Sequence, residues 1–199
     1  MANRNGKKYG LTALFPIKPG EHSAQLRSYL RSLDDPSVYP CGSPLCNVPI
    51  VHMARFVIID RLAYQGFPAR ADYLNRAYLL FMCDFDGADC AALVDAILDH
   101  MPEAAAAIWE HCIDFPIGQR RELIRGYFEK CQLETNLFLA DRPNDTVTDI
   151  LAALMLKREF GEFLIQVQRA PRNAKLLHSE FWQMWRQLES RAPPMPGSL

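Results

Sequence analysis

The stretch Ile50–Leu62, with the sequence IVHMARFVIIDRL, is the strongest strand signal in the chain. It is rich in β-branched residues, and successive side chains of a strand alternate between its two faces. Alternation assigns one face to His52, Ala54, Phe56 and Ile58, and the other to Met53, Arg55, Val57 and Ile59. Apart from His52 and Arg55 both faces are apolar, so something must cover each of them.

Further elements lie on either side of this strand. Extended segments are predicted at Tyr9–Ile17, Arg76–Phe85 and Thr135–Ala140, with amphipathic helices beginning near Glu21 and spanning Cys90–Met101. The resulting order, βαββαβ, is typical of a ferredoxin-like domain. We therefore predict an α+β fold, built on a ferredoxin-like four-stranded antiparallel sheet with an enlarged helical layer and a C-terminal helical extension.

More helices are expected around the last predicted strand. Before it, Glu103–Cys112 and an amphipathic piece after Gly118 form a helical insertion. After it, Thr146 can cap a helix that runs to about Phe160, and a final aromatic helix spans Leu176–Leu188. We predict this organisation: a flexible N-terminus (1–8), a ferredoxin-like domain with its helical insertion (9–165), a C-terminal helical extension (166–190) and a disordered tail (191–199).

Composition excludes several classes of function. The 199 residues are 49% apolar and 23% charged, so the chain can bury a core. The chain has a net charge of −1. It offers no basic field that would attract nucleic acid or an anionic membrane surface. The first residues are polar, and no run approaches the roughly 20 apolar residues of a spanning helix. We expect a soluble, cytoplasmic protein.

Six cysteines are dispersed along the chain, and free thiols are the better interpretation. The one close pair, Cys41 and Cys46, lies in a turn-rich loop with a C-x4-C spacing that differs from the C-x2-C of zinc knuckles. That loop ends at Pro49 and is long enough to act as a lid or to cover a sheet edge.

Five short stretches together resemble modules associated with dye-decolourising-type peroxidase proteins, within the dimeric α+β barrel superfamily. They are LFPIKPG (14–20), VHMARFVIID (51–60), LFMCDFDG (80–87), IWEHC (108–112) and TNLFLA (135–140). The resemblance implies a homodimer whose two sheets enclose a pocket, with haem as a possible cofactor. The peroxidases also use a proximal histidine and an Asp–Arg pair in a Gly-x-x-Asp-Gly context, and this chain has no Gly-x-x-Asp-Gly.

Two residues of the central strand could carry chemistry. His52 could be a haem or metal ligand, a general base, or a histidine hydrogen-bonded within the core. Arg55 at mid-strand must be paired or line a cavity, because an isolated buried charge is costly. Alternation places the two on opposite faces, and Asp84 or Asp86 would be natural partners for Arg55.

The pair Asp84 and Asp86 stands at the end of a strand, before Gly87. Paired carboxylates can do acid–base work or bind a cation, and the commoner use is to cap the helix that follows. We therefore predict a ligand site formed by His52, Arg55, Phe56, Asp84 and Asp86, with no metal cluster and no assigned catalytic residue.

The leading functional hypothesis is a small-molecule-binding or haem-related oxidoreductase-type accessory protein, with a pocket against the sheet. The alternative is a non-catalytic interaction module that docks on itself or on a partner enzyme, through an open sheet face or the helix that carries Trp182 and Trp185. Whether the protein is an enzyme stays open. The first hypothesis requires a cavity, and the second requires a surface that another protein covers.

Overall fold

The computed structural model describes residues 3–33, 37, 43–64, 66–67, 74–169 and 173–196. Its strands are β1 (Arg4–Asn5), β2 (Lys8–Pro16), β3 (Val51–Ile59) and β4 (Tyr78–Asp86). Its α-helices are α1 (His22–Ser32), α2 (Cys90–His100), α3 (Pro102–Trp109), α4 (Arg121–Cys131), α5 (Val147–Arg169) and α6 (Ala174–Glu189), and a 3-10 helix, η1, spans Pro44–Asn47. The predicted end of the first helix at 34–36 and residues 197–199 of the predicted tail lie outside the described residues.

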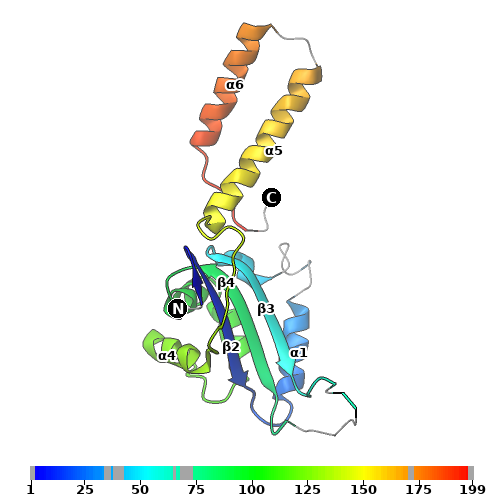
Figure 1. The fold of residues 1–199 in the computed structure, drawn as a ribbon, viewed down its shortest axis with the longest axis vertical. Coiled ribbons are helices and arrows are strands. Elements are labelled where there is room, and N and C mark those ends of the chain that lie inside the picture. The colour runs from blue at the N-terminus through cyan, green and yellow to red at the C-terminus, as the bar shows by residue number, and fades with distance from the viewer. Residues whose placement is uncertain are drawn as a thin grey trace.

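The four strands form one antiparallel sheet in the order β1-β2-β4-β3 (Figure 1). Strand β4 lies between β2 and β3, which are therefore parallel to each other, with α1 as the connection between them. The chain is thus an α+β protein, as predicted, and its three long strands coincide with the predicted segments.

The prediction of a fourth strand at Thr135–Ala140 was wrong. The edge position beside β2 belongs to β1, which reaches it through a tight hairpin with Gly6 at φ +61°. Further along the same edge, Gln132 bridges to Ala13. Because this edge of β2 is already occupied, the following residues cross the sheet instead of pairing with it. Residues 4, 5 and 8, placed by sequence in a flexible N-terminus, are part of the sheet.

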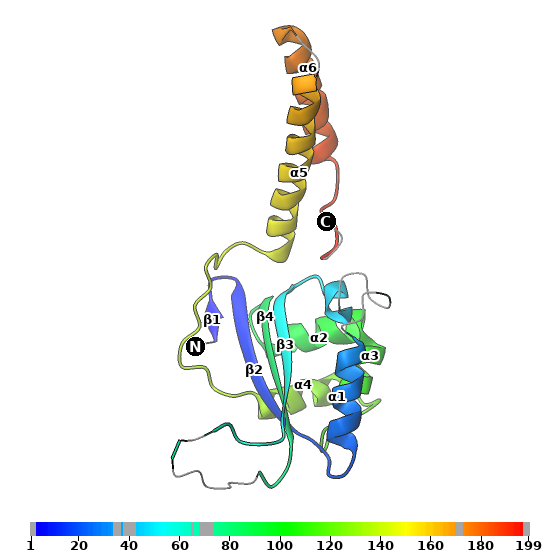
Figure 2. The ribbon, with the colours of Figure 1, turned by 90° about the vertical axis from the view of Figure 1, so that its right-hand side faces the viewer.

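Helices α1–α4 cover one face of the sheet, here called the inner face (Figure 2). The alternate residues of β2 and β4 that point to this face are buried, and Trp109 of α3 lies among their aromatic rings. Its ring centroid is 5.9 Å from Phe15 and 5.5 Å from Phe81. This aromatic cluster fixes how the helices sit on the sheet, because packed cores tolerate little change in volume.

The opposite, outer face of the sheet is only partly covered. The segment 133–145 runs over it on the β2 side (Figures 1 and 2), and the ring of Phe138 lies against Gly10, where an added Cβ would come within 2.8 Å. On the β3 side, Met53 is 69% exposed and Val57 is 38% exposed. The sequence argument that both faces must be covered therefore holds for only part of the outer face.

Helices α5 and α6 form a hairpin that projects from one end of the sheet (Figure 1). Helix α5 begins where predicted, because Thr146 and Asp149 form a reciprocal capping box: Asp149 N donates to Thr146 Oγ1 at 3.1 Å, and Thr146 N donates to Asp149 Oδ2 at 2.9 Å. It continues to Arg169 and not to about Phe160 as predicted, since Gly161 is too weak a breaker to end it. No helix among the described residues is long and apolar enough to cross a membrane.

Candidate functional site

A β-bulge decides where His52 lies. Val51 pairs with Phe85 and Met53 pairs with Asp84, so His52 is the extra residue that has no partner in the register. Simple alternation places His52 on the inner face with Phe56, but the bulge turns it towards the outer face, where its ring meets Asp86. The prediction that His52 and Arg55 lie on opposite faces was therefore wrong, because the period of two fails across a bulge.

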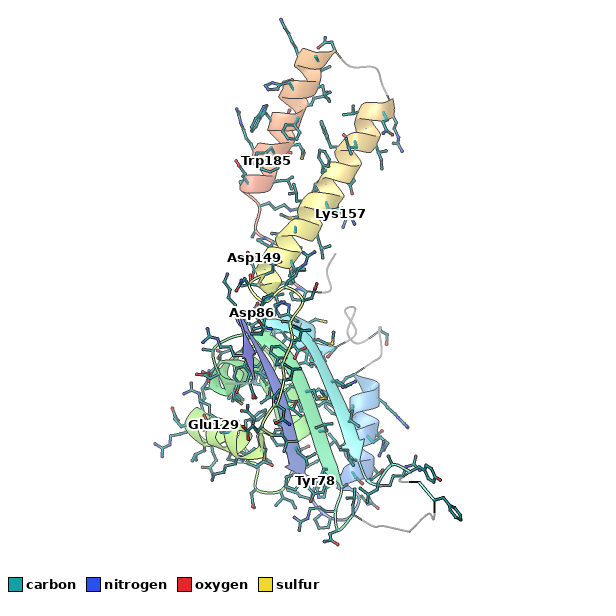
Figure 3. All side chains as sticks on the ribbon, viewed as in Figure 1. Tyr78, Asp86, Glu129, Asp149, Lys157 and Trp185 are labelled. Carbon is teal, nitrogen blue, oxygen red and sulfur yellow. The ribbon has the colours of Figure 1, made fainter. Side chains whose placement is uncertain are left out.

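Asp86 joins the sheet to the helical hairpin. Its Oδ1 lies 2.7 Å from His52 Nε2, and its Oδ2 accepts a hydrogen bond of 2.7 Å from the backbone N–H of Val147, in the first turn of α5. Figure 3 shows Asp86 at the end of the sheet beside the start of α5. Asp86 therefore caps α5, while the predicted cap of the helix after β4 is supplied by Asp89, which accepts from Ala92 N.

Asp84 lies next to this pair in a small outer-face pocket of about 280 Å³, which Lys8 and His52 also line. Burial raises the pKa of the Asp84 carboxyl, and the nearby His52 and Lys8 act in the opposite direction. Lys8 is itself buried, at 8% exposure. The outer-face pocket thus gathers acidic and basic groups under the segment 133–145, with Phe138 as part of its wall.

Arg55 pairs with neither of its predicted carboxylate partners. Its Nη2 lies 3.1 Å from the sulfur of Met82, on the outer face, and the residue is exposed. An exposed guanidinium stays hydrated, so it needs no buried counter-ion. The cost of an isolated buried charge therefore does not apply to Arg55.

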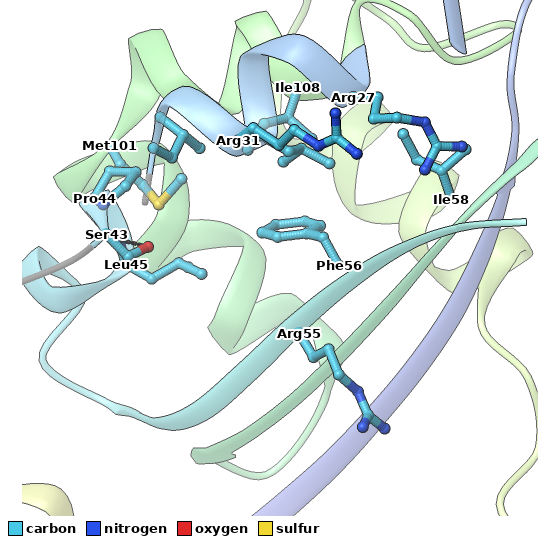
Figure 4. A pocket seen from close by; sticks show the side chains of 12 residues that line it. Arg27, Arg31, Ser43, Pro44, Leu45, Arg55, Phe56, Ile58, Met101 and Ile108 are labelled. Carbon is cyan, nitrogen blue, oxygen red and sulfur yellow. Dashed lines mark hydrogen bonds between the residues drawn. The ribbon is translucent and has the colours of Figure 1, made fainter. Parts of the chain in front are cut away.

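A larger cavity, of about 560 Å³, lies on the inner side between α1, η1 and the β3 edge of the sheet; we call it the α1–β3 cavity. Phe56 forms its floor, with its ring stacked on Phe81 at a centroid distance of 4.7 Å. In Figure 4 the Phe56 ring points into the cavity, whereas the Arg55 side chain points away from it. Its apolar lining residues are Leu30, Leu33, Pro44, Leu45, Phe56, Ile58, Met101 and Ile108.

Two arginines of α1 supply positive charge at this cavity. Arg27 is held by Asp60, with a nitrogen–oxygen distance of 2.6 Å. Arg31, one turn further along, projects over the space above the Phe56 ring (Figure 4). Within the described part of the chain, no carboxylate forms an ion pair with Arg31. The cavity therefore combines apolar walls with a guanidinium that can receive an anion.

The structure divides the predicted ligand site in two. His52, Asp84 and Asp86 come together on the outer face, whereas Phe56 lies in the α1–β3 cavity. Arg31 and Arg27 were missed as site residues, because on the helical wheel they fall on the face assigned to water. Their i, i+4 spacing puts both on one face of α1, and this was the available signal.

Three of the described cysteines are too deeply buried to be reactive. Cys83, Cys90 and Cys112 are buried, and burial raises the pKa values of the Cys90 and Cys112 thiols to about 12. Such thiols stay protonated and unreactive at neutral pH. Cys46 lies half-buried in η1, and its predicted companion Cys41 lies outside the described residues. No group of three potential metal ligands occurs in the described ranges.

Haem does not fit the residues that are present. The lining of the α1–β3 cavity includes no histidine, tyrosine or cysteine, the side chains that most often hold haem iron from the proximal side. His52 lies on the other face of the sheet, hydrogen-bonded to Asp86, in a pocket about half as large.

Comparisons with known proteins give no match to this chain. No protein-family model matches the chain, and neither a curated protein nor a solved structure matches it.

Proposed function

We propose that the protein binds a small amphipathic anion in the α1–β3 cavity, meaning an apolar molecule that carries one carboxylate or sulfonate group. The observation that carries this proposal is the guanidinium of Arg31, which projects over the ring of Phe56 in a cavity with apolar walls. The volume of about 560 Å³ falls in the range of ligand pockets.

The two parts of the cavity favour two parts of such a ligand. Contact with the apolar walls of the cavity stabilises the bound molecule by roughly 25 cal/mol for each Å² of its apolar surface that is removed from water. An arginine receives a carboxylate through two parallel N–H···O bonds, which fixes the orientation of the bound molecule. Arg27 stays engaged with Asp60, so Arg31 is the group that meets the anion.

A fluorescence titration with 1-anilinonaphthalene-8-sulfonate tests this function, because the probe carries apolar rings and one sulfonate. We expect saturable binding that weakens about tenfold in Arg31→Gln, the loss of one charge-assisted interaction. Phe56→Ala should weaken it too. Arg55→Gln is the matched control: Arg55 also borders the cavity, but its guanidinium points away from it and lies on the outer face against Met82. Equal affinities for Arg31→Gln and Arg55→Gln would contradict the proposal.

A hemin titration separates the haem-related form of this function from the one proposed. We expect no one-to-one Soret shift that depends on His52, because His52 does not line the α1–β3 cavity. A saturable shift lost in His52→Ala would instead move the site to the outer face.

We also propose that the sheet follows the ferredoxin-like plan of the dimeric α+β barrels. Supporting this, β2 and β3 run parallel on either side of β4, with α1 on the connection between them. The edge where that plan puts a fourth strand is taken here by β1. A high-resolution experimental structure in which β4 lies at an edge of the sheet would contradict this relationship.

A further inference from the structure

Helix α5 has two apolar faces, and α6 covers only one of them. On the covered side, the Phe163 ring packs 6.2 Å from the Phe181 ring, and Met155 is buried. The other face, which we call the outer stripe of α5, consists of Leu154, Gly161, Leu164 and Ile165. Their spacing is that of one helix face, and the three large side chains are 42–51% exposed.

The charges of the hairpin restrict what can cover this stripe. Helix α5 has three basic and three acidic side chains, and α6 has two of each, so each helix is neutral. A neutral surface gives no attraction to nucleic acid or to anionic lipid. It also gives no net repulsion between two identical copies. Lys157 is the one charged residue within the stripe, and its long stem can lie along apolar surface while its ammonium reaches water.

The two ends of α5 differ in charge. Asp149 lies in its first turn, at the base of the hairpin, whereas Arg169 ends the helix at the tip, where α6 follows with Lys175. Two copies packed antiparallel therefore place the Asp149 end of one α5 beside the Arg169 end of the other. The same orientation opposes the two helix dipoles favourably. It also keeps the two sheet domains at opposite ends, because the hairpin projects away from its own sheet (Figure 2).

Gly161 lies near the middle of the stripe. A Cβ added there would meet nothing within 4 Å, so no neighbour in the chain requires a glycine. A glycine inside a helix costs about 1 kcal/mol relative to alanine. At the crossing point of two antiparallel helices, the missing side chain would let the backbones approach closely.

We propose that a second copy of this chain covers the outer stripe of α5, with the two hairpins packed antiparallel into a four-helix bundle. Each copy then buries the same side chains, as a two-fold interface requires. The bundle completes the core that a single hairpin leaves half exposed. This association is independent of the ligand proposed for the α1–β3 cavity.

Sedimentation equilibrium of the full chain tests the association. We expect the wild type to dimerise, and Leu164→Glu to weaken the dimer at least about tenfold, because a carboxylate would be buried in the stripe. Ser179→Glu adds the same charge at an exposed position of α6 outside the stripe and should change nothing. A monomeric wild type, or equal effects of the two variants, would overturn the proposal. So would a dimer that survives Leu164→Glu but dissociates in Val57→Glu, which alters the outer face of the sheet.

Disulfide cross-linking tests the orientation. In the antiparallel bundle, Gly161→Cys lies next to its symmetry mate and should form a covalent dimer on oxidation. The two Lys175→Cys thiols would be separated by more than about 20 Å, because the tip of each hairpin lies eight residues beyond Gly161, and they should not join. The wild type controls for the native cysteines. Cross-linking of both variants would mean a parallel bundle, and cross-linking of neither would remove the proposed contact.

Discussion

The sheet with its covering helices and the α5–α6 hairpin bury their apolar side chains to different extents. In the first region Phe15, Phe81 and Trp109 are at most 1% exposed and pack on one another. In the two helices of the hairpin only Val147 and Met155 are buried, although both helices are rich in apolar residues. Two regions can thus form regular secondary structure while tertiary packing stabilises one of them far more than the other.

The largest expected effect comes from the centre of the core. Phe15→Ala should lower the free energy of unfolding by about 3–5 kcal/mol, because it removes a ring that packs on Trp109 and Phe128. Denaturant unfolding followed by circular dichroism measures this. Phe163→Ala, the same truncation in the hairpin seam, should leave the transition of the sheet region unchanged. A common shift of both regions would mean that they unfold as one cooperative unit.

A smaller effect is expected where the two regions meet. Asp86→Ala removes both the acceptor for Val147 N and the partner of His52, and should cost about 2 kcal/mol. Amide hydrogen exchange should accelerate in the first turn of α5. Asp84→Ala is the matched control, because within the described residues no hydrogen bond joins its carboxyl group to α5. Burial raises the pKa of this carboxyl group. If the two variants behaved alike, Asp86 would not be the residue that connects the sheet to α5.

The cap of α5 should contribute less, and only to the hairpin. Thr146→Ala loses the side-chain oxygen that accepts from Asp149 N, at a cost of about 1 kcal/mol. Exchange of the first amides of α5 should report it, with the sheet region unaffected. Thr148→Ala, two residues later on an exposed position, should be neutral or slightly stabilising. An effect of Thr146→Ala on the sheet would contradict the separation of the regions.

The smallest effect concerns pH and belongs to the sheet region alone. Burial lowers the pKa of His111, which lies 3.0 Å from His22, both measured at Nδ1, while Glu110 acts in the opposite direction. In the unfolded chain His111 binds a proton more readily, so stability should fall as the pH drops below about 6.5.

Urea titrations at several pH values measure that slope. His111→Gln should flatten it, and His178→Gln, in the hairpin, should leave it unchanged. A steeper slope in His111→Gln would mean that folding raises the pKa of His111 and does not lower it.

The sequence predictions were accurate where the signal lay within a single helix or strand. The three long strands and α2 were predicted because alternation and helical spacing are visible within a single element. The start of α5 was predicted from the capping residues Thr146 and Asp149. The strand at Thr135–Ala140 failed because pairing depends on a free edge, and that edge is filled from residues 4–5 and 132, far away in sequence.

The candidate site shows the same limit. Phe56 lies on the face that alternation assigned to it and lines the α1–β3 cavity, because the regular part of β3 keeps its alternation. His52 was placed on the wrong face, because a bulge depends on how β3 pairs with β4. Arg31 is exposed, as its place on the polar side of the helical wheel indicates, but the wheel does not show that η1 and β3 wall off a cavity beside it.

By itself, the sequence determined the α+β class, the three long strands and the six helices, because hydrophobic periodicity and capping act within a few residues. Tertiary structure alone decided the strand at the sheet edge, the face that receives His52, and the meeting of Asp86 with the start of α5. It also decided that α5 keeps an uncovered stripe. These features depend on contacts between segments distant in the chain, and no local pattern encodes which segments meet.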